Sequence, residues 1–576
     1  MTNKIKENYG FIIAIFVVFA AIFLFFASIR PVVPFDGDDW RYLSAFRHPL
    51  PDVNEWNPSR IFQEVINSLA GYFAAFIIYP FTQDYIYSIT ITTALFIAAF
   101  STALYFFLYK LFFAFSKSKN ISILAGFLIF ALFFSAFKGA AGSQYMLYAH
   151  NLCTMFAYTL PNLLVSITTC IFMRYTFENT SFSIKNFGWY KTGILIAVIY
   201  FSIFSILFSA LMLVLFCFFE ILFSIILKKE ILNKAAMFSI LGLFLVYCFL
   251  EFSGVRAANS DLAGTSNVSL FSVQFLYQFV YSFQNLYKLF IESNIMIFGL
   301  SFTVIFIAVL VYSVKGEDDP ETPALSRMFI ICLLSAVCLI PLLMIICGKT
   351  GTVYSTRLES LYSIFFYYFL TVAIGVIYLI KKTKFAAALL PLILIILFVE
   401  STNSSAPFLE QDNYSLEFEG RKMNTVIKAE LMASWIDEVM QADARGDTDV
   451  SISILKSTHE VGWPLPPDWY GEVLSSALFT HRMTSKKMNI ITVPDEFVTR
   501  KWLGRPLIPE ELIPGETLGD EIEVTQSADI ADMTEIPTIE TIPLMLKIIL
   551  SIAAVLFIVI VIITADRLMY KYGKGK

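Results

Sequence analysis

The chain has 576 residues, of which 57% are hydrophobic and 15% charged, and its formal net charge is −5. Its mean hydropathy of +0.70 excludes a soluble enzyme, because the value comes from apolar runs longer than the roughly 18 residues that cross a bilayer. These runs lack the alternation of barrel strands, so we expect an all-α polytopic membrane protein.

The first apolar run covers Phe11 to Ser28 and follows Lys4 and Lys6. Its downstream end is a poor small-residue cleavage site, so we expect an uncleaved signal anchor. Because basic residues gather in short cytoplasmic loops, this helix is predicted to run outward. Residues 30–60 then form the first extracytoplasmic loop.

That loop contains Phe35-Asp36-Gly37-Asp38-Asp39-Trp40-Arg41-Tyr42, which we name the acidic turn (residues 35–42). Three carboxylates in four residues raise one another's pKa and are costly to hold beside a membrane. Such a cluster binds a cation, takes a proton from a nucleophile, or simply lies solvated in a loop. Asp36 and Asp38 are the candidates for a divalent cation such as Mg or Mn, although hard cations need more oxygen ligands than this turn supplies.

The next segment, residues 61–78, begins after the helix-start signature Asn57-Pro58-Ser59-Arg60. It is long enough to span, but a crossing here would place Lys117 and Lys119 outside. We therefore expect a helix that lies along the outer interface. Its wetter turns would carry Arg60, Gln63, Glu64 and Asn67.

The basic loops divide the whole chain into twelve predicted spans, with both termini cytoplasmic. Residues 194–226 are too long for one span and are predicted to form a tight hairpin. The spans lie at 11–28, 85–108, 121–137, 155–173, twice within 194–226, and at 238–249, 295–312, 329–346, 361–380, 386–399 and 546–564.

Three regions follow: a membrane module (1–400), an extracytoplasmic domain (401–543), and a last helix with a basic tail (544–576). Within the domain, residues 424–440 are predicted as an amphipathic helix, and 450–455 and 488–493 as strands, which makes it α+β. Residues 510–541 are acidic and turn-rich, typical of a tether. The aromatic residues of the loop at 463–471 either stack on sugar rings or pack a core; they are Trp463, Trp469 and Tyr470.

Cationic side chains predicted on the outer side are candidates for binding a phosphate. They are Arg41, Arg60, Arg256, Lys349 and Arg357, the last with Tyr354 beside it. Alternatively, Arg357 snorkels to lipid headgroups, and Arg41 and Arg60 are counter-ions of the acidic turn.

Two further polar residues need an explanation. His150, at the outer mouth of a helix, either shuttles a proton or binds a sugar hydroxyl, or is a hydrogen-bonded structural residue. Glu220 lies in an apolar run, where we expect it to pair with Lys228 at the helix end. The seven cysteines lie in or beside apolar runs without CxxC spacing, so neither disulfides nor a zinc site is expected.

The whole architecture resembles the GT-C glycosyltransferases, with an acidic pair in the first outer loop, an interfacial helix, about a dozen spans and a terminal outer domain. Asp38-Asp39-Trp40-Arg41-Tyr42 resembles the acidic pair followed by Arg-Tyr of members that use lipid-phosphate sugars, although the usual pair is Asp-Glu. The resemblance implies transfer of a sugar from a polyprenyl-phosphate donor to a glycan or lipid acceptor at the outer face of the cell membrane. No nucleotide or nucleic acid is expected to bind.

The residue types suit this chemistry. Inverting transfer needs a carboxylate that accepts the proton of the attacking hydroxyl, and we expect Asp38 in this role. Asp39 or Asp36 would orient the acceptor or hold a divalent ion. The leaving phosphate needs cations.

Three rival functions remain open from the sequence. A transporter or flippase of a lipid-linked sugar would pair ionisable residues at mid-bilayer. A polysaccharide polymerase or ligase would centre its site on arginine-rich outer loops. A sensor or assembly factor would not depend on Asp38.

Overall fold

The computed structural model describes residues 2–503 apart from 140–141, 144, 150, 183, 228–232, 254–268, 316–321, 383–388, 404–413, 419–420 and 458–463. The chain divides into two compact units, residues 1–308 with 317–507, and residues 309–316 with 508–576. The site described below lies entirely in the first unit.

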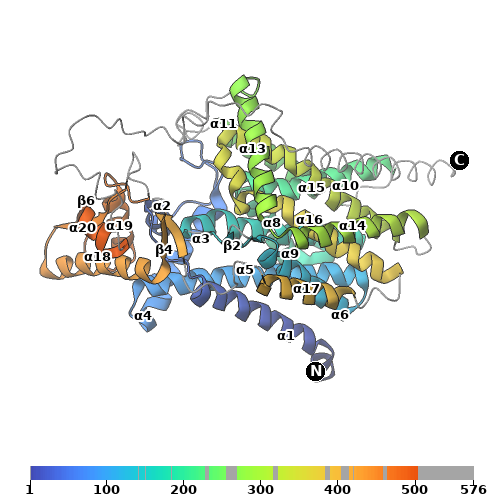
Figure 1. The fold of residues 1–576 in the computed structure, drawn as a ribbon, viewed down its shortest axis with the longest axis horizontal. Helices are drawn as coiled ribbons and strands as arrows, with labels where there is room; N and C mark the ends of the chain where they lie inside the picture. The colour runs from blue at the N-terminus through green and yellow to red at the C-terminus, as the bar shows by residue number, and fades with distance from the viewer. Residues whose placement is uncertain are drawn as a thin grey trace. The chain divides into compact units, whose positions relative to one another are not determined.

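Helices dominate the described residues (Figure 1). In the first half of the chain they are α1 (Thr2–Leu24), η1 (Phe25–Ile29), α2 (Gly37–Ser44), α3 (Ile61–Phe73), η2 (Ala74–Ile78), α4 (Tyr79–Thr82), α5 (Tyr85–Ser116), α6 (Lys119–Ser135), α7 (Leu152–Thr154), η3 (Met155–Thr159), α8 (Leu160–Phe177), α9 (Ile184–Ile203), α10 (Leu207–Ile226) and α11 (Lys234–Ser253). The second half adds α13 (Val273–Glu292), α14 (Ile295–Lys315), α15 (Thr322–Thr350), η4 (Thr352–Thr356), α16 (Leu358–Lys382) and α17 (Leu389–Asn403).

Nine helical segments among the described residues are long and apolar enough to cross a membrane, and three more apolar helices are shorter. This agrees with a polytopic helical membrane protein. The predicted hairpin within 194–226 is present, because α9 ends at Ile203 and α10 begins at Leu207. The predicted last span, 546–564, lies outside the described residues.

The predicted solvation of the polar side chains in residues 61–78 is wrong. Residues 61–82 form one of the nine long apolar segments, and the side chains of Gln63, Glu64 and Asn67 are buried rather than solvated. The apolar side chains of Phe76 and Phe81 are exposed instead. The polar stripe therefore faces the protein and the apolar stripe faces outward, as expected of a helix in contact with lipid.

Glu220 of α10 is buried and pairs with Arg327 of α15, with 3.3 Å between Oε1 and Nη1. The predicted partner, Lys228, lies outside the described residues. Arg327 lies in the first turns of α15 and Glu220 in the second half of α10, so the pair joins two helices and the pairing with Lys228 stays a prediction.

The C-terminal region, residues 414–503, is α+β. The hairpin of β3 (Tyr414–Phe418) and β4 (Arg421–Asn424) precedes α18 (Thr425–Arg445). The parallel strands β5 (Asp449–Leu455) and β6 (Asn489–Asp495) are joined through α19 (Tyr470–Thr480), and α20 (Glu496–Leu503) follows. The predicted helix and both strands are confirmed. We refer to this region as the C-terminal domain.

Candidate functional site

The acidic turn forms the start of a short helix. Asp36 is the N-cap of α2, and its Oδ1 accepts a hydrogen bond from the N–H of Asp39 at 2.9 Å. Asp39 returns the contact, because its Oδ2 accepts from the N–H of Phe35 at 2.8 Å and from that of Asp36 at 3.3 Å. The two carboxylates thus form a capping box, which fixes where α2 begins.

A second segment satisfies the remaining oxygens of this pair. Asn151 donates its side-chain N–H to Asp36 Oδ2 at 2.8 Å, and the backbone N–H of Cys153 donates to Asp39 Oδ1 at 2.5 Å. Asp36 is 1% exposed and Asp39 is fully buried. Burial raises the pKa of both carboxyls, and for Asp36 the charges of Asp39 and Asp38 raise the pKa further.

The cation opposite the pair is Lys428 of α18. Its side chain is fully buried, and its charge acts on Asp39 and Asp36. Burial lowers the pKa of Lys428 to about 8, while both carboxylates oppose that shift. Arg60 pairs with Glu251 rather than with these two carboxylates, whereas Arg41 as a counter-ion of the acidic turn stays a prediction.

Asp38 differs from its two neighbours because it is half-buried rather than buried. Its charge acts on Tyr42, whose pKa is raised mainly by burial and in part by the charges of Asp38 and Glu64. Of the three carboxylates, Asp38 is the one that is partly exposed.

A divalent cation does not fit the turn well. Both oxygens of Asp36 already accept N–H donors, and a buried ammonium supplies positive charge to Asp36 and Asp39. Hard cations take six or more oxygen ligands, and Asp38 alone cannot provide them. The described residues contain no cluster of three or more His, Cys, Asp or Glu that could hold a metal.

Gly37, the central residue of Asp-Gly-Asp, lies directly beneath Trp469. Its N–H donates to the carbonyl of Pro464 at 3.2 Å, and a Cβ at this position would collide with the Trp469 ring. Tyr470 is fully buried, and its hydroxyl accepts from Trp40 Nε1 and donates to the Phe35 carbonyl, each at 3.0 Å. Stacking of Tyr470 on a sugar is therefore wrong. Trp469 stays half-buried, and Trp463 lies outside the described residues.

Gly37→Ala should lower the free energy of unfolding by about 1–3 kcal/mol, because the added methyl overpacks the contact with Trp469. The melting temperature of the purified chain in detergent measures this. Gly193→Ala is the control, since a Cβ there meets no atom within 4 Å. Equal melting temperatures for the two variants would contradict the packing role of Gly37.

Arg357 lies in an aromatic cradle. Its guanidinium is 5.0 Å from the ring centroid of Tyr158 and 5.6 Å from that of Tyr354. Nε donates to Glu359 at 2.6 Å, and Nη2 donates to Thr154 at 3.4 Å. The N–H donors of Nη1 therefore have no partner among the described residues.

Arg60, like Arg357, is held by a carboxylate. Its Nε and Nη2 donate to Glu251 Oε1 of α11 at 3.1 and 3.0 Å, and Ser59 donates to the other oxygen of that carboxylate. The charge of Arg60 also acts on Tyr158 and Tyr354, the two rings that hold Arg357. Both arginines therefore face one region.

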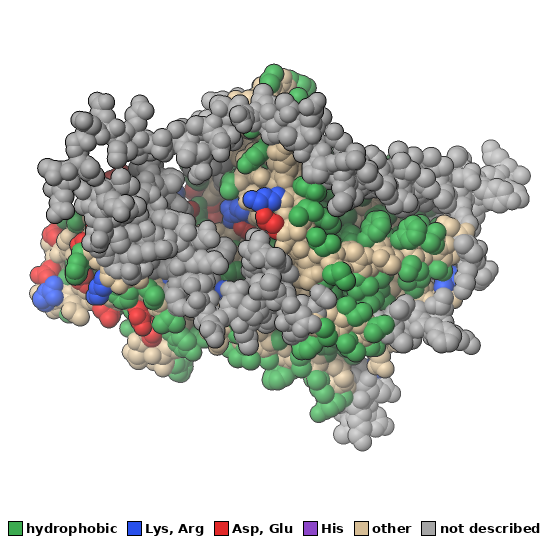
Figure 2. Space-filling model, viewed as in Figure 1, with side chains coloured by type: hydrophobic (Ala, Val, Ile, Leu, Met, Phe, Trp, Pro, Cys, Tyr) green, Lys and Arg blue, Asp and Glu red, His purple; other side chains and the backbone are tan. Residues whose placement is uncertain are grey.

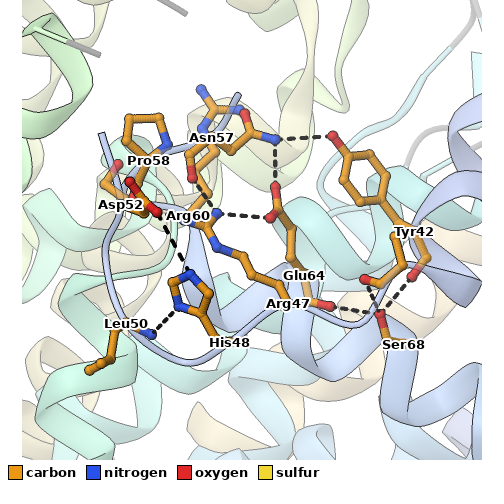
Figure 3. Close-up of polar contacts among 12 residues, drawn as sticks. Tyr42, Arg47, His48, Leu50, Asp52, Asn57, Pro58, Arg60, Glu64 and Ser68 are labelled. Carbon is orange, nitrogen blue, oxygen red and sulfur yellow. Dashed lines mark hydrogen bonds and ion pairs between the residues drawn. The ribbon is translucent and has the colours of Figure 1, made fainter. Parts of the chain in front are cut away.

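The loop before α3 is fixed by a third polar network (Figure 3). Arg47 donates to Glu64 at 2.8 Å, and Asn57 donates to Glu64 at 2.5 Å and to the Tyr42 hydroxyl at 3.0 Å. Glu64 and Arg47 are buried. This network attaches the end of α2 to α3, so both ends of the short helix are held.

Residues 151–154 connect the acidic turn to the arginines. Asn151 and Cys153 donate to the Asp pair, and Thr154 accepts from Arg357. The structure thus brings Asp36, Asp38, Asp39, Arg60, Tyr354 and Arg357 into one neighbourhood. Figure 2 shows acidic and basic side chains together in a hollow between apolar surfaces.

The other predicted residues are placed differently. Arg41 is exposed and lies 5.6 Å from the ring centroid of Tyr42. Lys349 is half-buried in the last turn of α15, where the adjacent Gly348 packs on α13. His150 and Arg256 lie outside the described residues.

Sequence reasoning missed Lys428, Asn151, Tyr158 and Glu359. Glu359 follows Arg357 by two residues, a spacing that could have suggested the pair. Lys428 lies almost 400 residues from the acidic turn in an ordinary amphipathic pattern, and nothing local marks it. No family model, curated protein or solved structure matches the chain.

Proposed function

We propose that the protein transfers a sugar from a polyprenyl-phosphate donor to a glycan or lipid acceptor of the bacterial cell envelope, at the outer face of the cell membrane. The observation that carries the proposal is the neighbourhood of one partly exposed carboxylate, Asp38, and two arginines, Arg60 and Arg357, whose Nη1 donors have no partner among the described residues.

In the reaction, an acceptor hydroxyl attacks the anomeric carbon, and Asp38 accepts its proton. The bond between that carbon and the phosphate oxygen breaks, and its electron pair leaves with the polyprenyl phosphate. Arg357 and Arg60 stabilise the charge that develops on this oxygen. Because each arginine is paired with a carboxylate on one side, its orientation is fixed before the donor arrives.

The two rings around Arg357 support this assignment. A guanidinium held against Tyr158 and Tyr354 keeps its charge while it loses water, which strengthens its attraction for a phosphate. The proposal includes cytoplasmic termini and an outer location for the acidic turn and the C-terminal domain, following the basic loops.

A transporter is less well supported. Its spans would carry ionisable pairs near the bilayer centre, whereas the pair of Glu220 and Arg327 lies toward helix ends. Arg60 with Glu251 and Arg357 with Glu359 lie at or beside helix ends as well.

The test is an envelope-glycan analysis of cells that carry the wild type, a deletion or Asp38→Asn at equal membrane levels of protein. We expect the deletion and Asp38→Asn to lack the same sugar, because an amide cannot accept the proton. Glu55→Gln, an exposed carboxylate of the same loop, is the matched control and should leave the glycan unchanged. A normal glycan in Asp38→Asn, when the deletion alters it, would overturn the proposal.

A further inference from the structure

The C-terminal domain contacts the acidic turn at several residues around the Asp pair. Tyr470 hydrogen-bonds to Trp40 and Phe35, Pro464 accepts from Gly37, and Trp469 covers Gly37. These contacts come from a region more than 400 residues further along the chain, in addition to those of residues 151–153.

Lys428 is the charged member of this contact. Its Nζ has no hydrogen-bond partner among the described residues, and it lies 5.4 Å from the ring centroid of Phe35. A buried ammonium without a hydrogen bond is costly. Only an opposite charge offsets that cost, and the charges that act on Lys428 are those of Asp39 and Asp36.

The positive charge of Lys428 in turn stabilises the two carboxylates. Two buried carboxylates that share a capping box repel each other and favour keeping a proton between them. A protonated pair is a weaker acceptor for the five N–H donors that define the start of α2 and attach it to residues 151–153. Asp38 lies on the first turn of that helix, so its direction depends on this cap.

We propose that Lys428 is a positioning residue: the C-terminal domain places its ammonium near Asp36 and Asp39, opposes protonation of this pair, and thereby holds Asp38 in place for the reaction. The inference rests on the proposed function for the role of Asp38, whereas the charge contact itself does not. The site is complete only while the C-terminal domain is docked.

The first experiment measures the contact without any activity, on the full chain purified in detergent. Lys428→Met should lower the melting temperature by about 5–10 °C, because it leaves buried carboxylates unpaired. Lys487→Met is the matched control, since Lys487 makes only an exposed contact with Glu472 and should change little. Lys428→Met with Asp39→Asn should be more stable than the sum of the two single effects predicts. Additive effects, or equal melting temperatures for the two methionine variants, would overturn the proposal.

The second experiment separates charge from packing. Membranes with Lys428→Ala should incorporate less of the sugar identified by the deletion strain, and ethylammonium chloride should restore incorporation. Ethanol or sodium chloride at the same concentration should not restore it, because neither supplies an ammonium to the vacated space. Equal recovery with ethanol and ethylammonium, or none with either, would overturn the positioning role.

The two proposals fail separately. If Lys428 and Asp39 are coupled in stability but Asp38→Asn leaves the glycan normal, the contact stands and the transferase assignment is wrong. If Asp38 is essential for the glycan but the stability effects are additive, the transferase assignment stands and the role of Lys428 is wrong.

Discussion

Arg357→Gln should reduce the rate of sugar transfer in isolated membranes by a factor on the order of 100 to 1,000, the range found when one preorganised donor to a developing anion is removed. The guanidinium is fixed by Glu359 and Thr154 and lies against Tyr158 and Tyr354. Glutamine fills part of the space and can still contact Glu359, but it carries no charge for the leaving phosphate.

The single variant leaves Glu359 buried without its counter-ion, so the amount of folded protein could fall as well. Arg357→Gln combined with Glu359→Gln removes both charges and should restore the membrane level of the protein while transfer stays low. Arg445→Gln, which removes an exposed pair with Asp447, is the control and should transfer normally. Normal transfer by the double variant would exclude Arg357 from phosphate binding.

The helices of the membrane part and the helix and strands of the C-terminal domain were predictable because both follow from hydrophobic periodicity within a short window. The hairpin of α9 and α10, the helix α18 and the strands β5 and β6 all follow from local patterns. Which way the polar side chains of residues 61–82 face was not predictable. A polar stripe faces water in a helix at an interface, but it faces the protein in a helix surrounded by lipid. The pattern is the same in both cases.

The acidic turn illustrates the same difference at the level of a site. Its sequence indicates that three carboxylates lie close together. The Asp-x-x-Asp spacing of Asp36 and Asp39 also matches that of a capping box. Which of the three carboxylates stays partly exposed depends on Asn151, Cys153 and Lys428. These contacts are set by tertiary packing between distant segments, and a single sequence carries no signal for them.

The last prediction concerns the pH dependence of the docked C-terminal domain. His481 is fully buried between the rings of Tyr72 and Tyr85, and its Nδ1 lies 2.5 Å from the Tyr85 hydroxyl. Burial lowers the pKa of His481 from 6.5 to about 4. The docked histidine is therefore neutral where an exposed one would already be charged.

The direction of the effect follows from proton uptake. Below about pH 6.5 the unfolded chain binds a proton at His481, and the folded chain does so only below about pH 4. Stability from this residue is complete above pH 6.5 and falls as the pH is lowered toward 4, by roughly 2 kcal/mol at pH 5. The raised pKa values of Asp36 and Asp39 act in the opposite direction, because the folded chain then binds the additional protons as the pH falls. Wild type must therefore be compared with a variant that lacks only the histidine.

His481→Gln should be less stable than the wild type at pH 7.5, and this difference should shrink by roughly 2 kcal/mol at pH 5, because glutamine takes up no proton. Hydrogen exchange of the α19 amides, corrected for the intrinsic rate at each pH, measures the free energy of opening next to His481. Phe479→Leu, which changes an exposed side chain of the same helix and removes no titratable group, should show the same difference from wild type at both pH values. A constant difference for His481→Gln would mean that the folded chain takes up a proton at His481 as readily as the unfolded chain, which would contradict the neutral buried imidazole.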